Sequence, residues 1–574
     1  MCIRDSVWDV ARGRWQGAWR GAAPVALATA GITTAALWQR ALHALNLPGP
    51  LWVDAVQHTL LARLIVERGA IPGDYLPYAQ VSPATYHFGF QSLVATLHLL
   101  TGMPLPEALL LLGQALSALA GLPLYVLGRR WGGSRWAGLA ASLVPAAITL
   151  MPPYYISWSR YTELAGLLIL PVAAVLWERW LQRRRWHVGL GLATAVALAG
   201  LLLTHVRVAA FMAVLALLML VRATLRRRYG PLAMAGPGLR ALAAVLTAAL
   251  MTLPWLGPAI QHLWLPAARD WPAGGDTLAL IYIFFGPTET VAQLLAAGGV
   301  LAFLWRRKEA ALLLLWVGLL PLLANPNLVG LQPGGPLERL WPGLHLGAVV
   351  DNTSLSIALY VPLGLAAALA VGGAAQAGRW LRRRIAAWQE AAGRRAAGRP
   401  ALNWAHLLGG VARWCGTALF LALGLWGVYQ LRGVVNTRTG LLAPADRAAI
   451  AWIEQHTPPD ALFLINSYEW MAHVYAGQDG GYWIGPLAGR RTWPPPALYG
   501  LGTRDYVEAV NRVAAEAMAA PSGEELYQLL RQHGITHVYL GRYGGALTAE
   551  ELLEWPGFRL VYRRDGVSIF CLEP

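Results

Sequence analysis

The sequence has 574 residues, of which 56% are hydrophobic and only 13% are charged. Because soluble proteins carry about 25% charged residues, this composition excludes an ordinary soluble enzyme and indicates a polytopic membrane protein. The formal net charge of +16 does not point to nucleic acid. The basic residues gather instead in short loops between apolar runs, as the positive-inside rule describes.

The beginning of the chain predicts an uncleaved membrane anchor. Residues 1–6 share no pattern with the sequence that follows, and we interpret them as an artefact that is not part of the fold. The first apolar run, 24–45, lacks a clear cleavage site and is therefore expected to stay attached as an anchor. The arginines at positions 12, 14 and 20 precede it, which predicts that the N-terminus lies on the inner side. The cysteines lie far apart in sequence and predict neither a disulfide framework nor a metal cluster. They are Cys2, Cys415 and Cys571.

About eleven apolar runs are long enough, at roughly 17–25 residues, to span a bilayer. They are 24–45, 106–127, 136–151, 162–178, 187–204, 206–221, 241–258, 287–304, 309–324, 353–373 and 412–430. The shorter run 88–101 contains Gln91 and His98, and we expect it to be interfacial or re-entrant. If 88–101 does not span the membrane, every arginine-rich loop falls on one side of it, as the positive-inside rule requires. The run 278–285 is a second candidate of this kind.

The same charge map assigns a side to each loop. The inner side receives the arginine-rich loops, and its segment 376–404 predicts a basic helix lying on anionic lipid. The other ionisable residues fall mostly in the outer loops. Those loops are 46–105, 152–161, 205–207, 259–286, 325–352 and everything after 431. Candidate chemistry is therefore expected on the outer face.

The C-terminal part predicts a small exported α/β domain. Helices are expected at 444–455, 505–518 and 522–532, and strands at 461–465, 535–540, 558–562 and 567–572. Ser522 and Glu525 have the spacing of a capping box, and Asp565-Gly566 predicts a hairpin turn. The expected domains are an inner N-terminus (1–23), a membrane domain (24–430) with a large first outer loop (46–105), and the outer α/β domain (431–574).

The first outer loop carries the most informative residues. Asp54 and His58 are four residues apart, so they share one face of a helix at the point where the chain first leaves the membrane. Ionisable groups are costly to place at a membrane edge, so a functional site is the default hypothesis. The alternative is structural: Asp54 would cap the helix or pair with His58 or Arg63.

Three short segments carry a resemblance to a known superfamily. The first comprises Asp54, His58, Arg63, Glu67, Gly69, Ile71 and Pro72, the second is 159–166, and the third is 479–484. Together with the large first outer loop and the exported domain, they resemble the GT-C membrane glycosyltransferases, and distantly the catalytic subunits of oligosaccharyltransferases. The third segment is similar to the end of the signature of those subunits, but it lacks the Trp-Trp-Asp core.

The resemblance implies a role for each candidate residue. Asp54 would be the base that takes a proton from an acceptor hydroxyl, and Arg160 would hold a lipid phosphate. The remaining candidates for binding substrate or phosphate are His58, His87, Glu163, His205, Arg207 and Arg339. A divalent ion, Mg²⁺ or Mn²⁺, is compatible with Asp54 and Glu163 as ligands. Structural alternatives stay open: Arg160 would pair with Glu163, and Asp351-Asn352 would cap a span.

The expected function is therefore inverting transfer of a hexosyl or pentosyl group from a polyprenyl-phosphate donor. The acceptor would be a lipid, glycan or protein outside the cytoplasm, and the expected location is a prokaryotic cytoplasmic membrane. The alternatives are a single-subunit oligosaccharyltransferase, which the missing Trp-Trp-Asp core disfavours, and a transporter or lipid flippase. A flippase should carry ionisable groups near mid-membrane, whereas the interiors of these runs are nearly free of charge. A non-catalytic scaffold would leave Asp54 without a role.

Overall fold

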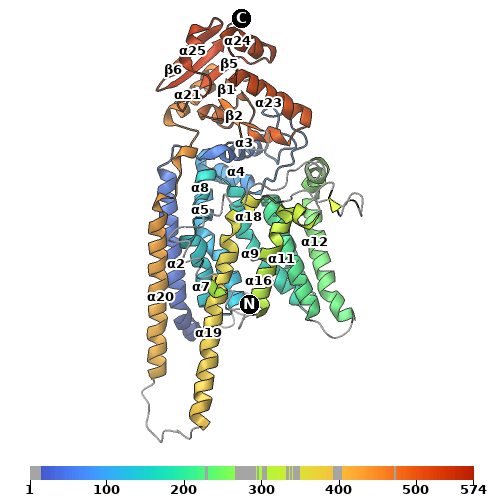
Figure 1. Ribbon diagram of the computed structural model, residues 1–574, viewed down its shortest axis with the longest axis vertical. Coiled ribbons are helices and arrows are strands. Elements are labelled where there is room, and N and C mark those ends of the chain that lie inside the picture. Colours follow the sequence, from blue (N-terminus) through green and yellow to red (C-terminus); the bar gives the residue numbers. More distant parts are fainter. Residues whose placement is uncertain are drawn as a thin grey trace.

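The protein consists of a bundle of long helices with a C-terminal α/β domain at one end (Figure 1). The computed structural model describes residues 15–226, 231–264, 293, 297–299, 307–330, 335–336, 339, 350–391, 404–470 and 474–573. The helices up to residue 430 are α2 (Trp15–Leu45), α3 (Trp52–Arg68), α4 (Gly89–Thr101), α5 (Leu105–Leu119), α6 (Gly121–Gly132), α7 (Arg135–Leu143), η1 (Val144–Ile148), α8 (Tyr155–Trp158), α9 (Tyr161–Gln182), α10 (Val188–Thr204), α11 (Val206–Leu225), α12 (Pro231–Ala259), η2 (Ile260–Trp264), α16 (Arg307–Ala324), η5 (Pro326–Val329), α18 (Asn352–Ala358), α19 (Tyr360–Ala391) and α20 (Trp404–Gln430).

Six helical segments of the described chain are long and apolar enough to cross a membrane. They are Leu105–Gly132, Tyr161–Gln182, Val206–Leu225, Gly236–His262, Asn352–Ile385 and Val411–Gly433, and the shorter apolar helices are Arg135–Ile148 and Val188–Thr204. These eight coincide with eight of the predicted runs. The predicted total of about eleven spans is not confirmed. The runs 24–45 and 309–324 lie in the described helices α2 and α16, which are not among these eight segments. The run 287–304 falls largely outside the described residues, as the second interfacial candidate, 278–285, does entirely.

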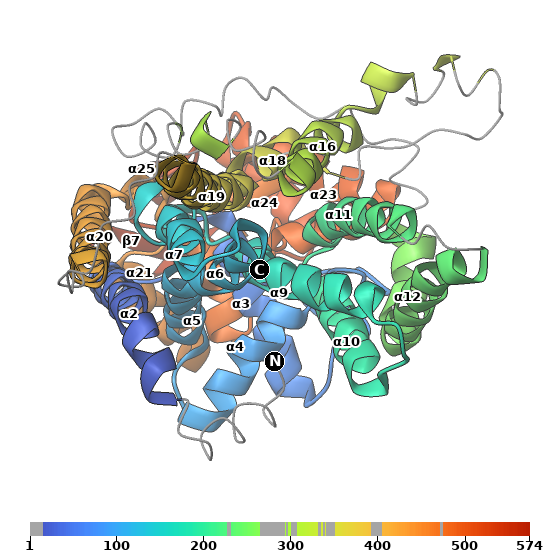
Figure 2. The ribbon, with the colours of Figure 1, turned by 90° about the horizontal axis from the view of Figure 1, so that it is seen from below.

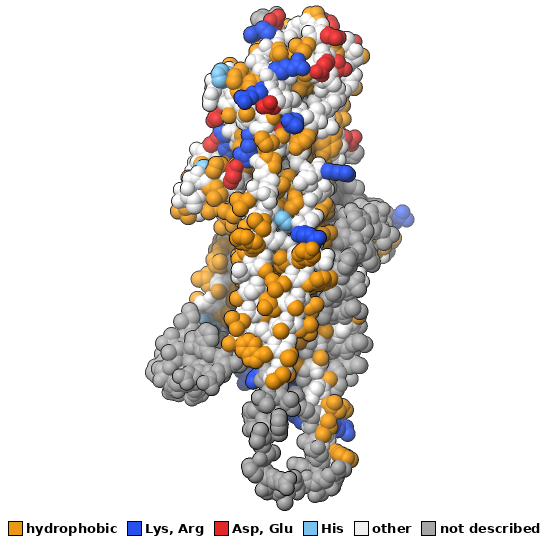
Figure 3. All heavy atoms as spheres, turned by 90° about the vertical axis from the view of Figure 1, so that its left-hand side faces the viewer, with side chains coloured by type: hydrophobic (Ala, Val, Ile, Leu, Met, Phe, Trp, Pro, Cys, Tyr) orange, Lys and Arg blue, Asp and Glu red, His pale blue; other side chains and the backbone are white. Residues whose placement is uncertain are grey.

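The surface of the bundle fits a membrane environment. On the face that Figure 3 shows, many hydrophobic and few charged side chains lie along the described middle of the bundle, whereas acidic and basic side chains gather over the C-terminal domain. Seen along its length, the bundle places α2 beside α20 at one edge and groups α9, α10, α11 and α12 toward the other (Figure 2). Apolar side chains facing outward cost nothing against lipid tails. The chain is an integral membrane protein.

Two short predictions about the bundle have different outcomes. The run 88–101 forms α4, whose 13 residues are too few to span a bilayer, as expected for an interfacial or re-entrant helix. The predicted basic helix at 376–404 is helical over its described part, up to residue 391, but it does not turn to lie along the membrane surface. There α19 continues without a break from Tyr360 to Ala391. Alanine and arginine both favour helix, so nothing in this stretch ends the span at the membrane surface.

The C-terminal domain is built around a five-stranded mixed sheet in the order β4-β1-β5-β7-β6. β1 pairs in parallel with β4 and with β5. β7 pairs antiparallel with β5 on one side and with β6 on the other. Its elements are η6 (Leu431–Gly433), η7 (Thr437–Thr439), α21 (Pro444–His456), β1 (Leu462–Ile465), β2 (Ser467–Glu469), β3 (Tyr475–Gly477), η8 (Gly480–Trp483), α22 (Ile484–Ala488), β4 (Arg491–Trp493), η9 (Ala497–Leu501), α23 (Arg504–Met518), α24 (Gly523–Gln532), β5 (His537–Leu540), α25 (Ala549–Glu554), β6 (Phe558–Arg564) and β7 (Val567–Leu572).

Two local signals in this domain act at the predicted positions. Ser522 caps α24 by accepting a hydrogen bond from the Glu525 backbone N–H, which is one of the two bonds of the predicted capping box; between these two described residues the return bond from the Glu525 side chain is not formed. Asp565 and Gly566 both adopt positive φ, at 51° and 84°, and so turn β6 into β7. The predicted helices and strands are all present. The short strands β2, β3 and β4 were not predicted, because three residues carry too little periodicity to be recognised.

The helix α3, in the first loop of the membrane part, packs against both the bundle and the C-terminal domain. Val53, Ala55 and Val56 are fully buried in the same hydrophobic cluster as Ile450 and Tyr482. In Figure 1, α3 lies between the bundle and the domain. The core that joins the two parts therefore draws on segments about 400 residues apart, and it fixes the position of Asp54.

Candidate functional site

Asp54 lies in the first turn of α3, at the junction of the bundle and the C-terminal domain. The preceding Trp52 has a left-handed φ of 71°, which turns the chain into the helix. Gln57 Nε2 donates a 2.7 Å hydrogen bond to Asp54 Oδ1. An acidic side chain in the first turn is also stabilised by the helix dipole. The carboxylate is half-buried, so it is held in place and still accessible.

The C-terminal domain holds α3 by polar contacts as well as by apolar packing. Arg63 Nη1 donates hydrogen bonds to the carbonyl oxygens of Pro486 and Leu487 at 3.1 Å and 3.0 Å. Burial raises the pKa of Tyr482, and the negative charge of Asp54 adds to that rise. The domain thus forms part of the surroundings of Asp54.

His58 does not pair with Asp54, and the structural alternative in which the two form a pair is wrong. Its Nδ1 instead lies 3.0 Å from Gln91 Nε2 of α4. His58 is 1% exposed, and burial together with the charge of Arg160 lowers its pKa to about 3. The imidazole is therefore neutral at pH 7 and links α3 to α4 in the interior.

His87 and His205 meet at the ends of two neighbouring segments. Their ring centroids are 4.8 Å apart, and Tyr86 stacks on His87 at 4.0 Å. Burial lowers the pKa of both histidines well below the usual value, so both rings are neutral. Within the described part of the chain, His87 Nε2 and His205 Nδ1 find no hydrogen-bond partner. Buried nitrogens in that condition are costly unless a ligand or water satisfies them.

Arg160 and Glu163 form an ion pair at the beginning of α9. Arg160 Nη2 lies 3.0 Å from Glu163 Oε2 and donates a 3.2 Å hydrogen bond to Ser354 Oγ of α18. Ser159 adopts a left-handed φ of 48° and ends α8, which brings Arg160 to the N-cap of α9. The Arg160–Glu163 ion pair of the structural alternative is therefore present. The pair does not use all the hydrogen-bond donors of Arg160, because a guanidinium has five N–H groups.

Arg207 and Asp351 form a second ion pair, at the beginning of α11 and α18. Arg207 Nη1 lies 2.8 Å from Asp351 Oδ2. Asp351 also caps α18, as predicted, by accepting a 2.6 Å hydrogen bond from the Ser354 backbone N–H. The first turns of α9, α11 and α18 thus meet at this end of the bundle. Helix N-termini attract anions.

Electrostatic interactions join these groups into one site. Burial raises the pKa of Asp54, while the positive charges of Arg160 and Arg207 oppose that rise. Burial disfavours the charged form of Arg160, but the carboxylates of Glu163, Asp54 and Asp351 outweigh it and raise the arginine pKa. A carboxylate with a raised pKa beside two arginines can accept a proton next to a bound anion. We define the candidate site as Asp54, Arg160, Arg207 and Asp351 with the His87–His205 pair.

Two predicted residues do not join the candidate site in the way expected. Arg339 is exposed, and its side chain forms no hydrogen bond or ion pair with a described residue, so the structure does not connect it to the site. Glu163 pairs with Arg160, and its electrostatic neighbours do not include Asp54. Among the described residues, no group of three or more His, Cys, Asp or Glu could hold a metal ion. Mg²⁺ or Mn²⁺ stays a prediction, and we assign no step to it.

Sequence reasoning missed several partners in the site. Gln57, Gln91 and Ser354 hold Asp54, His58 and Arg160, and Tyr482 approaches Asp54 from the C-terminal domain. The i, i+3 spacing could have suggested Gln57. No local signal marks Gln91 or Ser354, because each reaches the site from a helix distant in sequence.

Comparison with known proteins places the chain in a family. The profile of a family of unknown function, DUF6541, matches residues 3–570. The chain belongs to this family. No curated protein matches it in sequence.

Solved structures with the same fold are membrane glycosyltransferases. ArnT from Cupriavidus metallidurans, bound to undecaprenyl phosphate, superposes with a TM-score of 0.51 at 13% identity, over 96% of this chain and 98% of ArnT. The mycobacterial arabinofuranosyltransferase AftD gives 0.55 at 15% identity, over 96% of this chain but only 40% of AftD. The oligosaccharyltransferase AglB of Archaeoglobus fulgidus gives 0.49 at 11% identity, over 91% and 69%. The chain therefore has the GT-C fold, as the sequence resemblance indicated.

Proposed function

We propose that the chain transfers a sugar from a polyprenyl-phosphate donor to an acceptor at the end of the bundle that carries the C-terminal domain. The observation that supports this most is the placement of the Asp54 carboxylate within the field of two arginines, Arg160 and Arg207, at one membrane edge. A base and an anion site are the two elements that this transfer requires. The GT-C fold and the lipid phosphate bound to ArnT agree with the proposal.

The reaction would be a single displacement. The Asp54 carboxylate takes the proton of an acceptor hydroxyl as its oxygen attacks the anomeric carbon. The bond from that carbon to the phosphate oxygen breaks, and the anomeric centre inverts. The electron pair leaves with polyprenyl phosphate, which needs no separate acid because a phosphate is a good leaving group. Hexosyl and pentosyl groups both fit this scheme.

The arginines would bind the phosphate and stabilise the charge that it gains. Arg160 and Arg207 each use part of the guanidinium in an ion pair and keep further N–H donors. The first turns of α9 and α11 add their positive dipole ends. Because the charge on the leaving phosphate increases along the reaction, donors fixed in advance favour the transition state. Glu163 and Asp351 would keep the two guanidinium groups in place.

The neutral histidines would contact the sugar. His87 Nε2 and His205 Nδ1 lack partners among the described residues, and sugar hydroxyls would satisfy them. His58, which is bonded to Gln91, would keep α3 in register with α4. The domain of residues 431–574 would cover the site through Tyr482 and bind the acceptor.

The proposed orientation follows the arginine-rich loops. The N-terminus would face the cytoplasm, and the C-terminal domain would lie outside a prokaryotic cytoplasmic membrane. The acceptor would then be an extracytoplasmic lipid, glycan or protein. Arg339 remains a further candidate for the phosphate site.

An Asp54→Asn variant tests the proposal. Membranes with the wild type should transfer labelled sugar from a panel of polyprenyl-phosphate hexoses and pentoses, and the variant should lose about a hundredfold or more of the rate. Asp74→Asn is the matched control, because Asp74 lies in the same loop but is paired with Arg68 on the surface. Unchanged transfer by Asp54→Asn would contradict the assignment of the base. Absence of wild-type transfer from every lipid donor, with and without Mg²⁺ or Mn²⁺, would contradict the reaction class.

A further inference from the structure

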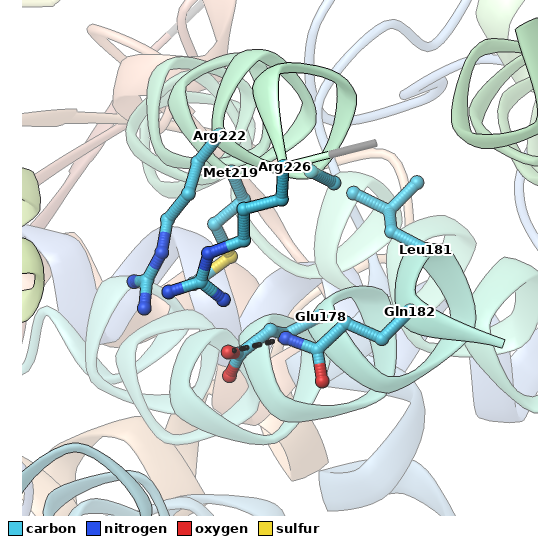
Figure 4. Close-up of a pocket in the computed structure, with 7 residues that line it drawn as sticks. Glu178, Leu181, Gln182, Met219, Arg222 and Arg226 are labelled. Atoms are coloured by element: carbon cyan, nitrogen blue, oxygen red, sulfur yellow. Dashed lines mark hydrogen bonds between the residues drawn. The ribbon is translucent and has the colours of Figure 1, made fainter. Parts of the chain in front are cut away.

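A cavity of about 190 Å³ lies at the end of the bundle opposite the candidate site. Glu178, Leu181 and Gln182 line it from the last turn of α9, and Met219, Arg222, Ala223 and Arg226 line it from the end of α11 (Figure 4). Arg160 and Arg207, by contrast, lie at the beginning of these two helices. The volume far exceeds the space that one water molecule needs. The cavity is therefore large enough to hold part of a ligand larger than water, and it is separate from the proposed reaction centre.

The floor of the cavity is apolar and its rim is polar. Leu181 and Met219 are 1% and 3% exposed, whereas Gln182 and Arg226 are exposed. In Figure 4 the guanidinium groups of Arg222 and Arg226 project from α11 toward Glu178 and Gln182. A ligand with an anionic head and an apolar tail would match this gradient, with the head at Arg226 and the tail toward Met219.

The charges around the cavity do not balance. Arg130 of α6 binds the Glu178 carboxylate, and Arg222 Nη2 lies 2.6 Å from Glu309 Oε1 of α16. Gln182 Nε2 donates a 2.9 Å hydrogen bond to the other oxygen of Glu178. Both acids therefore already have a cationic partner. Arg226 forms no ion pair or side-chain hydrogen bond with a described residue, although the carboxylates of Glu309 and Glu178 attract its charge from a greater distance. Because three arginines (Arg130, Arg222 and Arg226) stand against these two carboxylates, one positive charge is in excess.

The position of the cavity selects the kind of anion. It lies where two apolar helices, both candidate membrane spans, come to their ends. That is the level of the lipid headgroups. Basic pockets between membrane helices are suited to anionic headgroups, because the phosphate meets arginine while the glycerol and acyl chains meet the apolar wall.

We propose that this cavity binds an anionic phospholipid of the leaflet opposite the C-terminal domain. Arg226 and the outer N–H groups of Arg222 donate to the lipid phosphate, and Leu181, Met219 and Ala223 contact the glycerol and the upper acyl chain. Glu178 faces the same space and opposes the anion, and its pairing with Arg130 limits that repulsion. The bound lipid would tie α9 to α11 at this leaflet.

Native mass spectrometry of the full chain in neutral detergent tests the proposal. Phosphatidylglycerol is the probe, phosphatidylcholine is the zwitterionic comparison, and glycerol 1-phosphate is the soluble phosphate without acyl chains. We expect phosphatidylglycerol to bind at least tenfold more tightly than either. Equal binding of phosphatidylcholine would overturn the anionic selectivity, and equal binding of glycerol 1-phosphate would show that the ligand is a free phosphate and not a lipid.

Four variants locate the site. Arg226→Gln should weaken phosphatidylglycerol binding about tenfold, and Ala223→Phe should weaken it by filling the cavity. Glu178→Gln should strengthen binding because it removes the opposing charge, an increase that a merely structural role would not produce. Arg179→Gln is the control, since Arg179 is an exposed arginine of the same helix end that does not line the cavity. Equal affinity in Arg226→Gln, Ala223→Phe and Arg179→Gln would overturn the proposal, and the lipid-free melting temperature verifies folding.

Discussion

Arg207 Nη1 lies 2.8 Å from Asp351 Oδ2, and this ion pair joins the first turn of α11 to the N-cap of α18. Burial raises the pKa of Asp351, but Arg207 and Arg160 outweigh it and lower that pKa below its usual value. The carboxylate therefore stays charged and holds Arg207 at the site. The pair links the stability of the bundle to the proposed phosphate binding.

The two contributions can be separated by a double variant. Arg207→Gln leaves Asp351 half-buried without its partner, and it should lower the free energy of unfolding by about 1–3 kcal/mol. Asp351→Asn added to it should restore most of that stability, since asparagine caps α18 equally well. The KM for the lipid donor should stay raised in the double variant, because the arginine is still missing. Thermal unfolding and donor titration measure the two effects, and a double variant with wild-type KM would contradict a role in phosphate binding.

Asp54 gives the reaction a predicted pH dependence. Burial raises its pKa, and a base must be deprotonated to act, so kcat/KM should fall as the pH drops through that raised value. The Gln57 hydrogen bond opposes the rise. Gln57→Leu should therefore move the acid limb of the pH profile to higher pH, with a smaller effect on the plateau. A pH profile of kcat/KM for the two proteins measures the shift, and an unmoved limb would contradict Asp54 as the base.

Periodicity and turn chemistry predicted much of the fold. Eight apolar runs coincide with apolar helices of the structure, and Ser522 and Asp565-Gly566 act as the predicted cap and turn. These features depend on neighbours within a few residues, so the sequence displays them directly. The continuation of α19 beyond the predicted span 353–373 was missed because charge alone does not end a helix.

The partners in the site could not be predicted in the same way. Residue type and position identified Asp54 and Arg160, but His58 meets Gln91 and Arg160 meets Ser354 through contacts between distant helices. The burial of α3 under the C-terminal domain also depends on residues about 400 positions apart. Such contacts follow from tertiary packing, which leaves no periodic trace in one sequence.

The packing of α3 predicts that the C-terminal domain and the site are coupled. Val56 is fully buried against the domain, whereas Val66 of the same helix is half-buried and lies outside that cluster. Val56→Ala should destabilise the protein by about 1–3 kcal/mol and increase protease cleavage between α20 and α21. Val66→Ala should have a smaller effect on both. Thermal unfolding and limited proteolysis compare the variants, and equal behaviour of the two would contradict a core shared by α3 and the domain.

Because the pKa of the Asp479 carboxyl is raised, we expect the C-terminal domain to lose stability as the pH rises. Burial raises its pKa to about 7, although the Gly481 and Gly541 backbone N–H groups donate to its two oxygens. The folded state then keeps its proton up to about pH 7, while the unfolded carboxyl loses it near pH 4. The contribution of the protonated Asp479 to the free energy of unfolding is therefore complete below about pH 4. It falls by up to about 1.4 kcal/mol per pH unit between pH 4 and pH 7.

An Asp479→Asn variant isolates this contribution. It cannot lose a proton, and its amide N–H group opposes one of the two glycine donors, so it should be less stable than the wild type at pH 5. The difference should shrink toward pH 8, because only the wild type loses stability as its carboxyl ionises. Asp460→Asn, at an exposed position of the same domain, is the control and should follow the wild type. Thermal unfolding from pH 4.5 to 8 measures the three proteins, and a difference independent of pH would show that Asp479 ionises normally in the folded domain.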